Sequence, residues 1–254
     1  MDRKNDADSK YKIEPTKTPL KDSIPKCLDS NIVPDVSKVI RMILAGYSNC
    51  GKSTLIINLI SRFWKKLSGE PYFDYVFCFS KTMGKDESYN DIIKRGFIKR
   101  EHIYDNIDEE VLQQIVDCRK AEVENAKSYE KIPTVLLLFD DILTDTNINS
   151  KIVSEIFFSG RHILLNTIFS IQKWNAIPYR NRESASHIIL YKPRGTKASD
   201  LIAEELSESG KKKQFIQMYN HAVKEPYGFF YIKNNEQDPS KKYFKNMDVQ
   251  LNIK

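Results

Sequence analysis

The chain has 254 residues, a formal net charge of +6 and a hydrophobic fraction of 41%. That length favours one compact domain with a sizeable core, and four cysteines scattered over positions 27, 50, 78 and 118 exclude a dense disulfide scaffold and a closely spaced zinc site. Because no apolar stretch approaches the ~18 residues of a spanning helix and the N-terminus lacks a signal-peptide core, we expect a soluble intracellular protein without membrane insertion.

Residues 1–37 mix charged side chains with four prolines and show no sustained period, which predicts an extended N-terminal arm. From 38 to 235, apolar runs alternate with helical patterns, which predicts an α/β domain with a mainly parallel central sheet and helices on both faces. The expected strands are 39–45, 73–79, 134–140, 163–171, 186–191 and 227–233. The expected helices are 52–67, one within 108–128, 148–158, and stretches within 198–222. Between these elements, 81–102 is expected to be an irregular basic segment and 236–254 a C-terminal tail.

The first predicted strand leads into Gly46-Tyr-Ser-Asn-Cys-Gly-Lys-Ser, which fills every position of the phosphate-binding pattern G-x-x-x-x-G-K-[ST]. Its glycines let the loop curl so that backbone N–H groups face phosphate oxygens. Lys52 is expected to reach the β- and γ-phosphates, Ser53 to place its hydroxyl on Mg²⁺, and Thr54 to bond near the α-phosphate. The sequence therefore predicts a nucleoside-triphosphate site formed by Gly46, Ser48, Asn49, Cys50, Gly51, Lys52, Ser53 and Thr54.

The second half of the site is predicted where the apolar run 134–139 ends in Asp140 and Asp141. Such a run is typical of a parallel strand buried on both faces, and its carboxyl end lies where open α/β sheets bind ligands. Asp140 is expected to hold Mg²⁺ through its water shell, and Asp141 to orient the attacking water as general base. The alternative is that the two acids only end a strand.

Three further side chains complete the predicted catalytic set. The run 163–171 ends in Gln172, whose amide could fix the lytic water or contact the γ-phosphate. An arginine from an adjacent subunit can stabilise the transferring phosphoryl group. Arg161 is the first candidate for this role and Arg180 the second, and a surface arginine paired with a carboxylate is the alternative for each.

Cys50 offers a local prediction because it lies at the predicted helix start beside Lys52. If exposed, its thiol should have a lowered pKa, and alkylation should block nucleotide binding. The alternative is a small buried side chain that reagents do not reach.

The order of these motifs resembles the genome-packaging ATPases of poxviruses, other nucleocytoplasmic large DNA viruses and virophages, a branch of the FtsK–HerA superfamily with an ASCE/RecA-like P-loop fold. The resemblance covers residues 38–195 and continues more weakly to about 233. Its most specific part is the block from Gly160 through Gln172 to Pro178. Family members often carry Glu where this chain has Asp141.

The resemblance implies an ATPase that packages a viral genome into a preformed capsid. It also implies a ring, a hexamer or pentamer, with ATP at subunit boundaries, double-stranded DNA in the channel and capsid vertex proteins as partners. The expected location is the viral factory in the host-cell cytoplasm, or the virion. In such a fold, the Gln172 strand lies between the Gly46 strand and the Asp140 strand.

DNA contacts are expected on the basic segment, because phosphate binding needs cations and loops are free to move. The candidates are Lys81, Lys85, Lys94 and Arg95. A solvated basic surface is the alternative for these residues.

Two other functional classes share the phosphate loop. A nucleotide or nucleoside kinase usually has an arginine-rich lid, whereas the stretch after Lys192 is rich in lysine. A switch GTPase needs the pattern Asn/Thr-Lys-x-Asp, and after Thr196 and Lys197 this chain places Asp200 one residue too late. The kinase therefore stands as the alternative to the DNA motor.

Overall fold

The computed structural model describes residues 34–128, 131–142 and 146–251. The predicted arm over 1–37 lies almost entirely outside these residues. The strands are β1 (Arg41–Ala45), β2 (Tyr75–Phe79), β3 (Ile103–Tyr104), β4 (Val135–Asp140), β5 (Leu165–Ile171), β6 (His187–Tyr191), β7 (Phe229–Lys233), β8 (Tyr243–Lys245) and β9 (Val249–Leu251). The α-helices are α1 (Lys52–Asn58), α2 (Glu87–Lys94), α3 (Glu109–Asn125), α4 (Lys151–Ser159), α5 (Tyr179–Glu183), α6 (Thr196–Leu206) and α7 (Lys212–Ala222).

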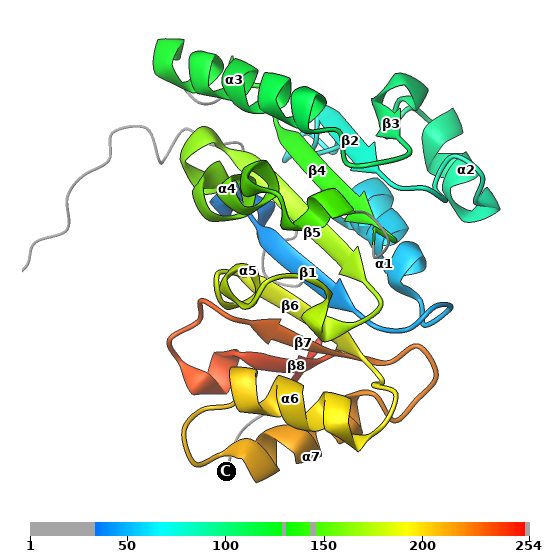
Figure 1. Ribbon diagram of the computed structural model, residues 1–254, viewed down its shortest axis with the longest axis vertical. Coiled ribbons are helices and arrows are strands. Elements are labelled where there is room, and N and C mark those ends of the chain that lie inside the picture. Colours follow the sequence, from blue (N-terminus) through cyan, green and yellow to red (C-terminus); the bar gives the residue numbers. More distant parts are fainter. Residues whose placement is uncertain (1–33, 129–130, 143–145, 252–254) are drawn as a thin grey trace, which may run out of the picture.

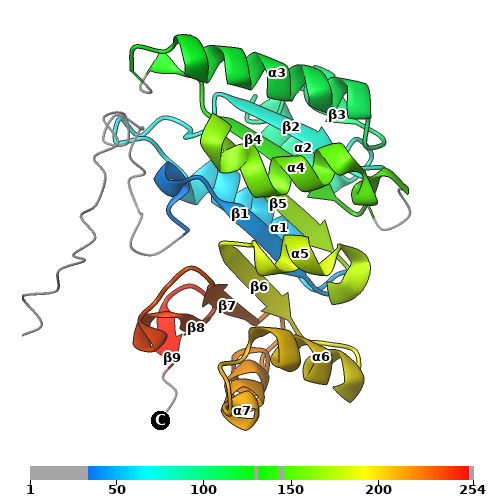
Figure 2. The ribbon, with the colours of Figure 1, turned by 60° about the vertical axis from the view of Figure 1, so that its left-hand side comes forward.

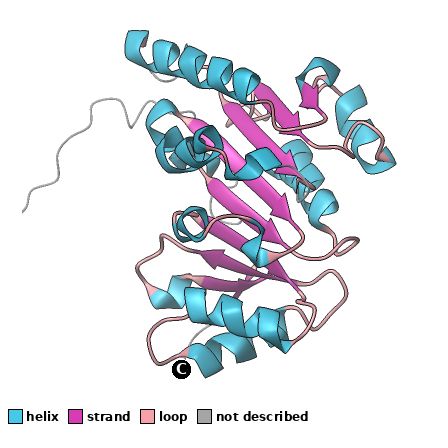
Figure 3. Ribbon diagram, viewed as in Figure 1, coloured by secondary structure: helices cyan, strands magenta, loops and turns pink. Residues whose placement is uncertain are grey.

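These strands form one sheet in the order β3-β2-β4-β5-β1-β6-β7-β8-β9. The six strands from β3 to β6 are parallel, and β7, β8 and β9 continue the sheet in antiparallel pairs. Figure 1 shows the sheet as one continuous layer, and Figure 3 shows helices on both of its sides. The predicted α/β fold with a mainly parallel sheet is confirmed.

The two faces of the sheet carry separate cores, because successive strand side chains point to opposite faces. On one face, Met42 and Leu44 of β1 join buried residues of α1 and α2. On the other face, Ile43 and Ala45 join buried residues of the helices from α3 to α7, excluding α5. Figure 2 shows α4 and α6 in front of the sheet and α1 behind it. Every residue of β1 and β5 is buried, as expected for central strands covered on both faces, although β5 includes the polar residues Asn166, Thr167 and Ser170.

The expectation of an irregular segment over 81–102 was wrong, because this stretch contains α2. Asp86 caps the helix by accepting a hydrogen bond from the Ser88 amide at 2.9 Å. Tyr89 and Ile92 are fully buried, one helical turn apart, against the core of the α1 face. Gly96, with φ 77°, lies just after the helix in the left-handed region that commonly ends one.

The sheet also continues past residue 235, through the segment expected to be a tail. β8 pairs with β7, and β9 pairs with β8. Tyr243 of β8 is buried and stacks on Phe230, with ring centroids 5.7 Å apart. These strands contain only three residues each, so their stability comes from this packing rather than from a sustained local pattern.

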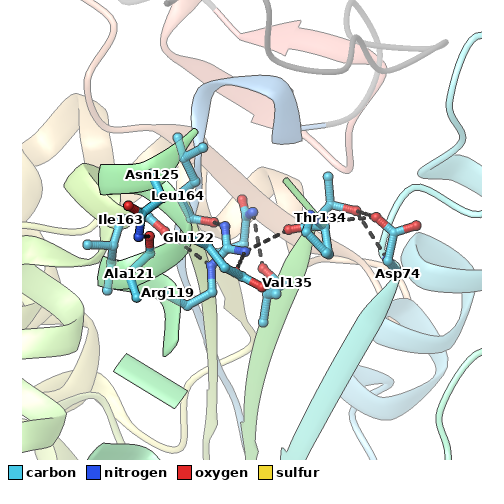
Figure 4. Close-up of polar contacts among 11 residues, drawn as sticks. Asp74, Arg119, Ala121, Glu122, Asn125, Thr134, Val135, Ile163 and Leu164 are labelled. Atoms are coloured by element: carbon cyan, nitrogen blue, oxygen red, sulfur yellow. Dashed lines mark hydrogen bonds and ion pairs between the residues drawn. The ribbon is translucent and has the colours of Figure 1, made fainter. Parts of the chain in front are cut away.

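A buried arginine organises the amino ends of β4 and β5 (Figure 4). The Arg119 guanidinium of α3 donates to the carbonyl oxygens of Pro133 at 2.9 Å and Ile163 at 3.3 Å, and forms an ion pair with Glu122 at 2.6 Å. Burial lowers the pKa of Arg119. Because three separate segments contribute acceptors, this side chain ties the entries to both strands together.

Candidate nucleotide-binding site

The predicted phosphate loop connects the carboxyl end of β1 to the start of α1. A Cβ atom on Gly46 would lie 2.6 Å from Cβ of Tyr191 and 2.7 Å from Sγ of Cys50, so only glycine fits there. Gly51 has φ 104° and Asn49 has φ 63°, both left-handed. The loop therefore needs its glycines for the tight curl that turns backbone N–H groups inward.

Lys52, the first residue of α1, folds back over this loop. Its Nζ donates to the carbonyl oxygens of Gly46 at 2.7 Å and Tyr47 at 3.0 Å. The ammonium group is thus held above the curl, where it can exchange these neutral acceptors for phosphate oxygens.

The Cys50 thiol does not behave as expected for an exposed residue. It is 5% exposed, and burial raises its pKa, although Lys52 acts in the opposite direction. The exposure on which the prediction of a lowered pKa depended is not met, because the thiol fills the space beside Gly46. Its position fits the alternative of a small buried side chain.

The strand order brings the two predicted halves of the site together. β5 pairs with β1 on one side and with β4 on the other. Gln172 follows β5 and therefore lies between the loop after β1 and the acids at the end of β4. This placement, implied by the family resemblance, is confirmed.

Gln172 and Asp141 form a direct pair at this edge. Gln172 Nε2 donates to Asp141 Oδ1 at 2.6 Å. The Asp141 backbone has φ 54°, and its amide donates to the Ser170 carbonyl at 3.3 Å. Left-handed backbone is uncommon outside glycine and enriched in Asp and Asn, so this turn directs one carboxylate oxygen to the glutamine amide.

Asp140 lies deeper than Asp141, with 4% exposure. Burial raises its pKa, while the hydroxyls of Ser170 and Tyr89 and the charge of Lys52 act against that shift. Tyr89 Oη donates to Asp140 Oδ2 at 2.9 Å. Burial raises the pKa of the Tyr89 hydroxyl and the nearby Ser53 hydroxyl acts against this shift, so Tyr89 lies close to both predicted Mg²⁺ ligands.

This donor set fits Mg²⁺ bound together with a nucleotide. Magnesium prefers oxygen ligands, and such sites use one or two carboxylates, water and the substrate phosphates. Among the residues that the structure describes, no group of three or more His, Cys, Asp or Glu side chains is arranged to hold a metal by itself. The serine hydroxyl and the Asp140 carboxylate would therefore act with phosphate oxygens.

Tyr89 is a site residue that the sequence analysis missed, since it belongs to the segment expected to be irregular. A usable signal was present, because Asp86 is a good N-cap and the apolar residues Tyr89, Ile92 and Ile93 have helical spacing. The pairing with Asp140, 51 residues away, has no such local signal.

The two arginine candidates contact residues other than Gln172 and Asp141. Arg161 is exposed and precedes β5, so the seven-residue strand separates it from Gln172 by about 20 Å. Arg180 is exposed on α5, and its Nη2 donates to Ser154 Oγ at 3.1 Å. Arg161 therefore lies far from the Gln172–Asp141 pair of its own chain, and the catalytic role of either arginine stays a prediction.

The four basic candidates for DNA contact are all exposed. Lys81 and Lys85 follow β2, whereas Lys94 and Arg95 lie at the end of α2, not on a loop. Arg95 forms an ion pair with Asp91 at 3.1 Å and lies 4.9 Å from the centroid of the Phe97 ring. Part of this basic surface is thus already neutralised within the chain.

No helix in the described part of the chain is long and apolar enough to cross a membrane.

Comparison with known proteins places these features in context. Residues 35–234 match the protein family described as "Poxvirus A32 protein". The DNA packaging protein OPG160 of Monkeypox virus is 24% identical over 184 residues, covering 71% of this chain and 56% of that protein. The uncharacterized protein 075L of Invertebrate iridescent virus 6 is 29% identical over 206 residues, covering 80% of this chain and 74% of that protein. The chain thus spans little more than half the length of the Monkeypox virus relative.

A solved structure shows the same fold. The genome packaging NTPase B204 from Sulfolobus turreted icosahedral virus 2, in complex with AMP, superposes with a TM-score of 0.54 at 16% identity. The match covers 85% of this chain and 99% of B204. At this identity the likeness establishes the P-loop ATPase architecture, a mostly parallel sheet between helices.

Proposed function

Because the chain belongs to the poxvirus A32 protein family, we propose that it is an ATP-driven motor that moves double-stranded DNA into a preformed viral capsid. The relatives named as DNA packaging proteins support this function. The same relatives disfavour the alternative of a nucleotide kinase.

One observation carries the proposal, the Gln172–Asp141 pair that the strand order sets beside the phosphate loop. The pair offers a carboxylate that can accept a proton from water and an amide that fixes the carboxylate's direction. A γ-phosphate held by Lys52 would lie next to it. The arrangement suits hydrolysis, in which the acceptor of the phosphoryl group is water.

In this mechanism each group has a separate task. Lys52 releases the carbonyl oxygens of Gly46 and Tyr47 and neutralises phosphate charge. Asp141 accepts the proton of the attacking water, and Gln172 holds Asp141 in place. Ser53 and Asp140 would hold Mg²⁺, which when bound shields the charge of the β- and γ-phosphates.

The assembly belongs to the same proposal. Arg161 lies at the sheet edge opposite its own loop, so it can complete a site only on a neighbouring subunit. This position fits an arginine that acts between copies of the chain. The proposed assembly is a homo-oligomeric ring, a hexamer or pentamer, with duplex DNA in its channel and capsid vertex proteins at one end. The motor would work in the viral factory or on the virion.

The test is steady-state ATP hydrolysis by the purified protein, with and without long duplex DNA, over a series of salt concentrations. We expect DNA to stimulate hydrolysis and the stimulation to vanish at high salt, because phosphate contacts release counterions. Lys52→Ala and Asp141→Asn should abolish both basal and stimulated hydrolysis. A hydrolysis rate that DNA does not change, together with rapid phosphoryl transfer to an added nucleotide or nucleoside, would instead establish a kinase.

A further inference from the structure

An exposed tyrosine stands on the flank of the phosphate loop away from the catalytic acids. Tyr227 lies two residues before β7, and β7 runs antiparallel to β6 with Phe229 opposite Tyr191. The start of β7 is therefore at the same sheet edge as the end of β1. In the order β4-β5-β1-β6-β7, the acids after β4 lie on one side of the loop and Tyr227 on the other.

The backbone of Tyr227 is strained. Residues 225–228 form a tight turn in which the Gly228 amide donates to the Glu225 carbonyl at 3.1 Å. Pro226 and Tyr227 are its central residues, and Tyr227 has φ 61°. Gly or Asn normally fills that position of a turn, because a bulky side chain is disfavoured at positive φ. Strained residues of this kind cluster at functional sites, so the surroundings of this side chain bear on its role.

The strained turn presents an aromatic ring that is 72% exposed. A Cβ atom on Gly51 would lie 3.4 Å from Cδ1 of Tyr227, so the ring stands against the last glycine of the loop. Beneath the ring, Tyr191 Oη donates to the Gly51 carbonyl at 3.2 Å. Tyr227, Asn49 and Cys50 line one cavity of about 340 Å³. This cavity is therefore continuous with the phosphate loop.

The direction of a bound nucleotide follows from these positions. Its γ-phosphate would face Gln172 and Asp141, and its phosphate chain would follow the loop around Lys52. The nucleoside then leaves the loop on the opposite flank, towards β6 and β7. An exposed aromatic ring at that point can stack on the flat face of a base. Such base–aromatic stacking contributes substantially to the free energy of binding.

We propose that the Tyr227 ring is the stacking platform for the base of the bound nucleoside triphosphate. This inference rests on the proposed ATPase function and adds the residue that holds the non-phosphate part of the substrate. Stacking requires a ring and no hydroxyl, so Tyr227→Phe is expected to preserve it.

The test compares two ligands in the presence of Mg²⁺, ATP and inorganic tripolyphosphate, by titration calorimetry or by competition with a labelled nucleotide. Tyr227→Ala should weaken ATP binding about tenfold or more and leave tripolyphosphate binding unchanged. Tyr227→Phe should bind both ligands like the wild type. Tyr179→Ala, at an aromatic residue of α5 that is 55% exposed, serves as the matched control and should bind both normally.

A second variant separates binding from folding. Tyr227→Gly removes the ring and the strain of a non-glycine residue at positive φ. Its Tm should therefore equal or exceed that of the wild type, while its ATP affinity falls. A ring that only supports the loop would give a lower Tm and an equal loss for both ligands, which would overturn the proposal. Unchanged ATP affinity in Tyr227→Ala would also overturn it. If the wild type bound neither ligand, the proposed function would fail together with the base site.

Discussion

The amino and carboxyl ends of β4 and β5 are held together in different ways. At the amino ends, the buried Arg119 guanidinium binds several backbone carbonyls at once, and Asp74 binds both the amide and the hydroxyl of Thr134. At the carboxyl ends, Gln172 and Asp141 make a contact that a phosphate or a water molecule can replace. Both ends also contain a residue with positive φ, so this backbone conformation alone does not identify the ligand-binding edge.

Leu164 and Asp141 illustrate this point, since both have φ 54°. The Leu164 carbonyl accepts from Arg119 at 3.4 Å, so its turn is braced by a buried cation. Asp141 instead directs its carboxylate to Gln172 at the edge where ligands bind. We therefore expect changes at the amino ends to alter stability, and changes at the carboxyl ends to alter activity.

The largest expected effect is that of Asp141→Asn, which should lower kcat for ATP hydrolysis about 10³-fold, because the amide cannot accept the proton of water. Asn tolerates the left-handed backbone, so Tm should change little. The same substitution at the other edge, Asp74→Asn, is the control. It should leave kcat unchanged and cost about 1 kcal/mol of unfolding free energy. A loss of activity in Asp74→Asn at a temperature where it is folded would show that the amino edge also contributes to catalysis.

Next in size is Arg119→Met, which should reduce the free energy of unfolding by about 3 kcal/mol, since it leaves buried carbonyl groups without their donor. Denaturant unfolding measures this change. Nucleotide affinity should stay that of the wild type. A variant with normal stability and weakened ATP binding would contradict the assignment of Arg119 to the amino edge.

A pH effect of intermediate size is expected from His187, the first residue of β6. Burial, with the charges of Lys233, Lys38 and Arg41, lowers its pKa from 6.5 to about 3. Between these values the unfolded chain binds a proton that the folded chain does not, so stability falls as pH falls. From pH 7 to pH 5 the loss is about 2 kcal/mol.

His187→Gln isolates this contribution, because Gln can keep the hydrogen bond that joins His187 Nδ1 to Tyr231 Oη at 2.9 Å but does not titrate. Unfolding curves at pH 5, 6 and 7 should show a shallower pH dependence for the variant by about 2 kcal/mol over this range. Parallel curves for the two proteins would refute the prediction.

The smallest effect is expected at the carboxyl edge, from the tyrosine that contacts Asp140. Tyr89→Phe removes the hydroxyl that donates a hydrogen bond to Asp140 and lies close to the Ser53 side chain. We expect the Mg²⁺ concentration for half-maximal hydrolysis to rise about fivefold, with a loss of stability near 1 kcal/mol. Magnesium titrations at saturating ATP measure the first quantity. A change in stability with no change in Mg²⁺ dependence would show that Tyr89 only supports packing.

Local chemistry explains which parts of the site could be predicted from the sequence. Gly46 to Ser53 form one contiguous pattern, and Asp140 ends one apolar run, so neighbouring residues carry the signal. The insertion of the Gln172 strand between them came from the family resemblance, because strand order depends on contacts distant in sequence. The catalytic roles of these residues stay predictions.

The features that could not be predicted also depend on contacts that form only in the folded chain. The pKa of Cys50 depends on its burial against Gly46, which sequence spacing does not reveal. The contact from Tyr89 to Asp140 depends on how α2 packs on the sheet. β8 and β9 gain their stability from β7 and the core, so their own three-residue patterns are too short to predict.

The position of β5 has a consequence for timing in the proposed ring. This strand is buried along its whole length, with Arg161 shortly before it and Gln172 immediately after it. If Arg161 enters the site of a neighbouring subunit, one stiff segment joins two successive sites. A shift of the strand when the nucleotide beside the Gln172–Asp141 pair is hydrolysed would then be transmitted to the neighbour's nucleotide. Hydrolysis at one site after another around the ring would then be coupled allosterically through a single strand, without a separate domain for communication between sites.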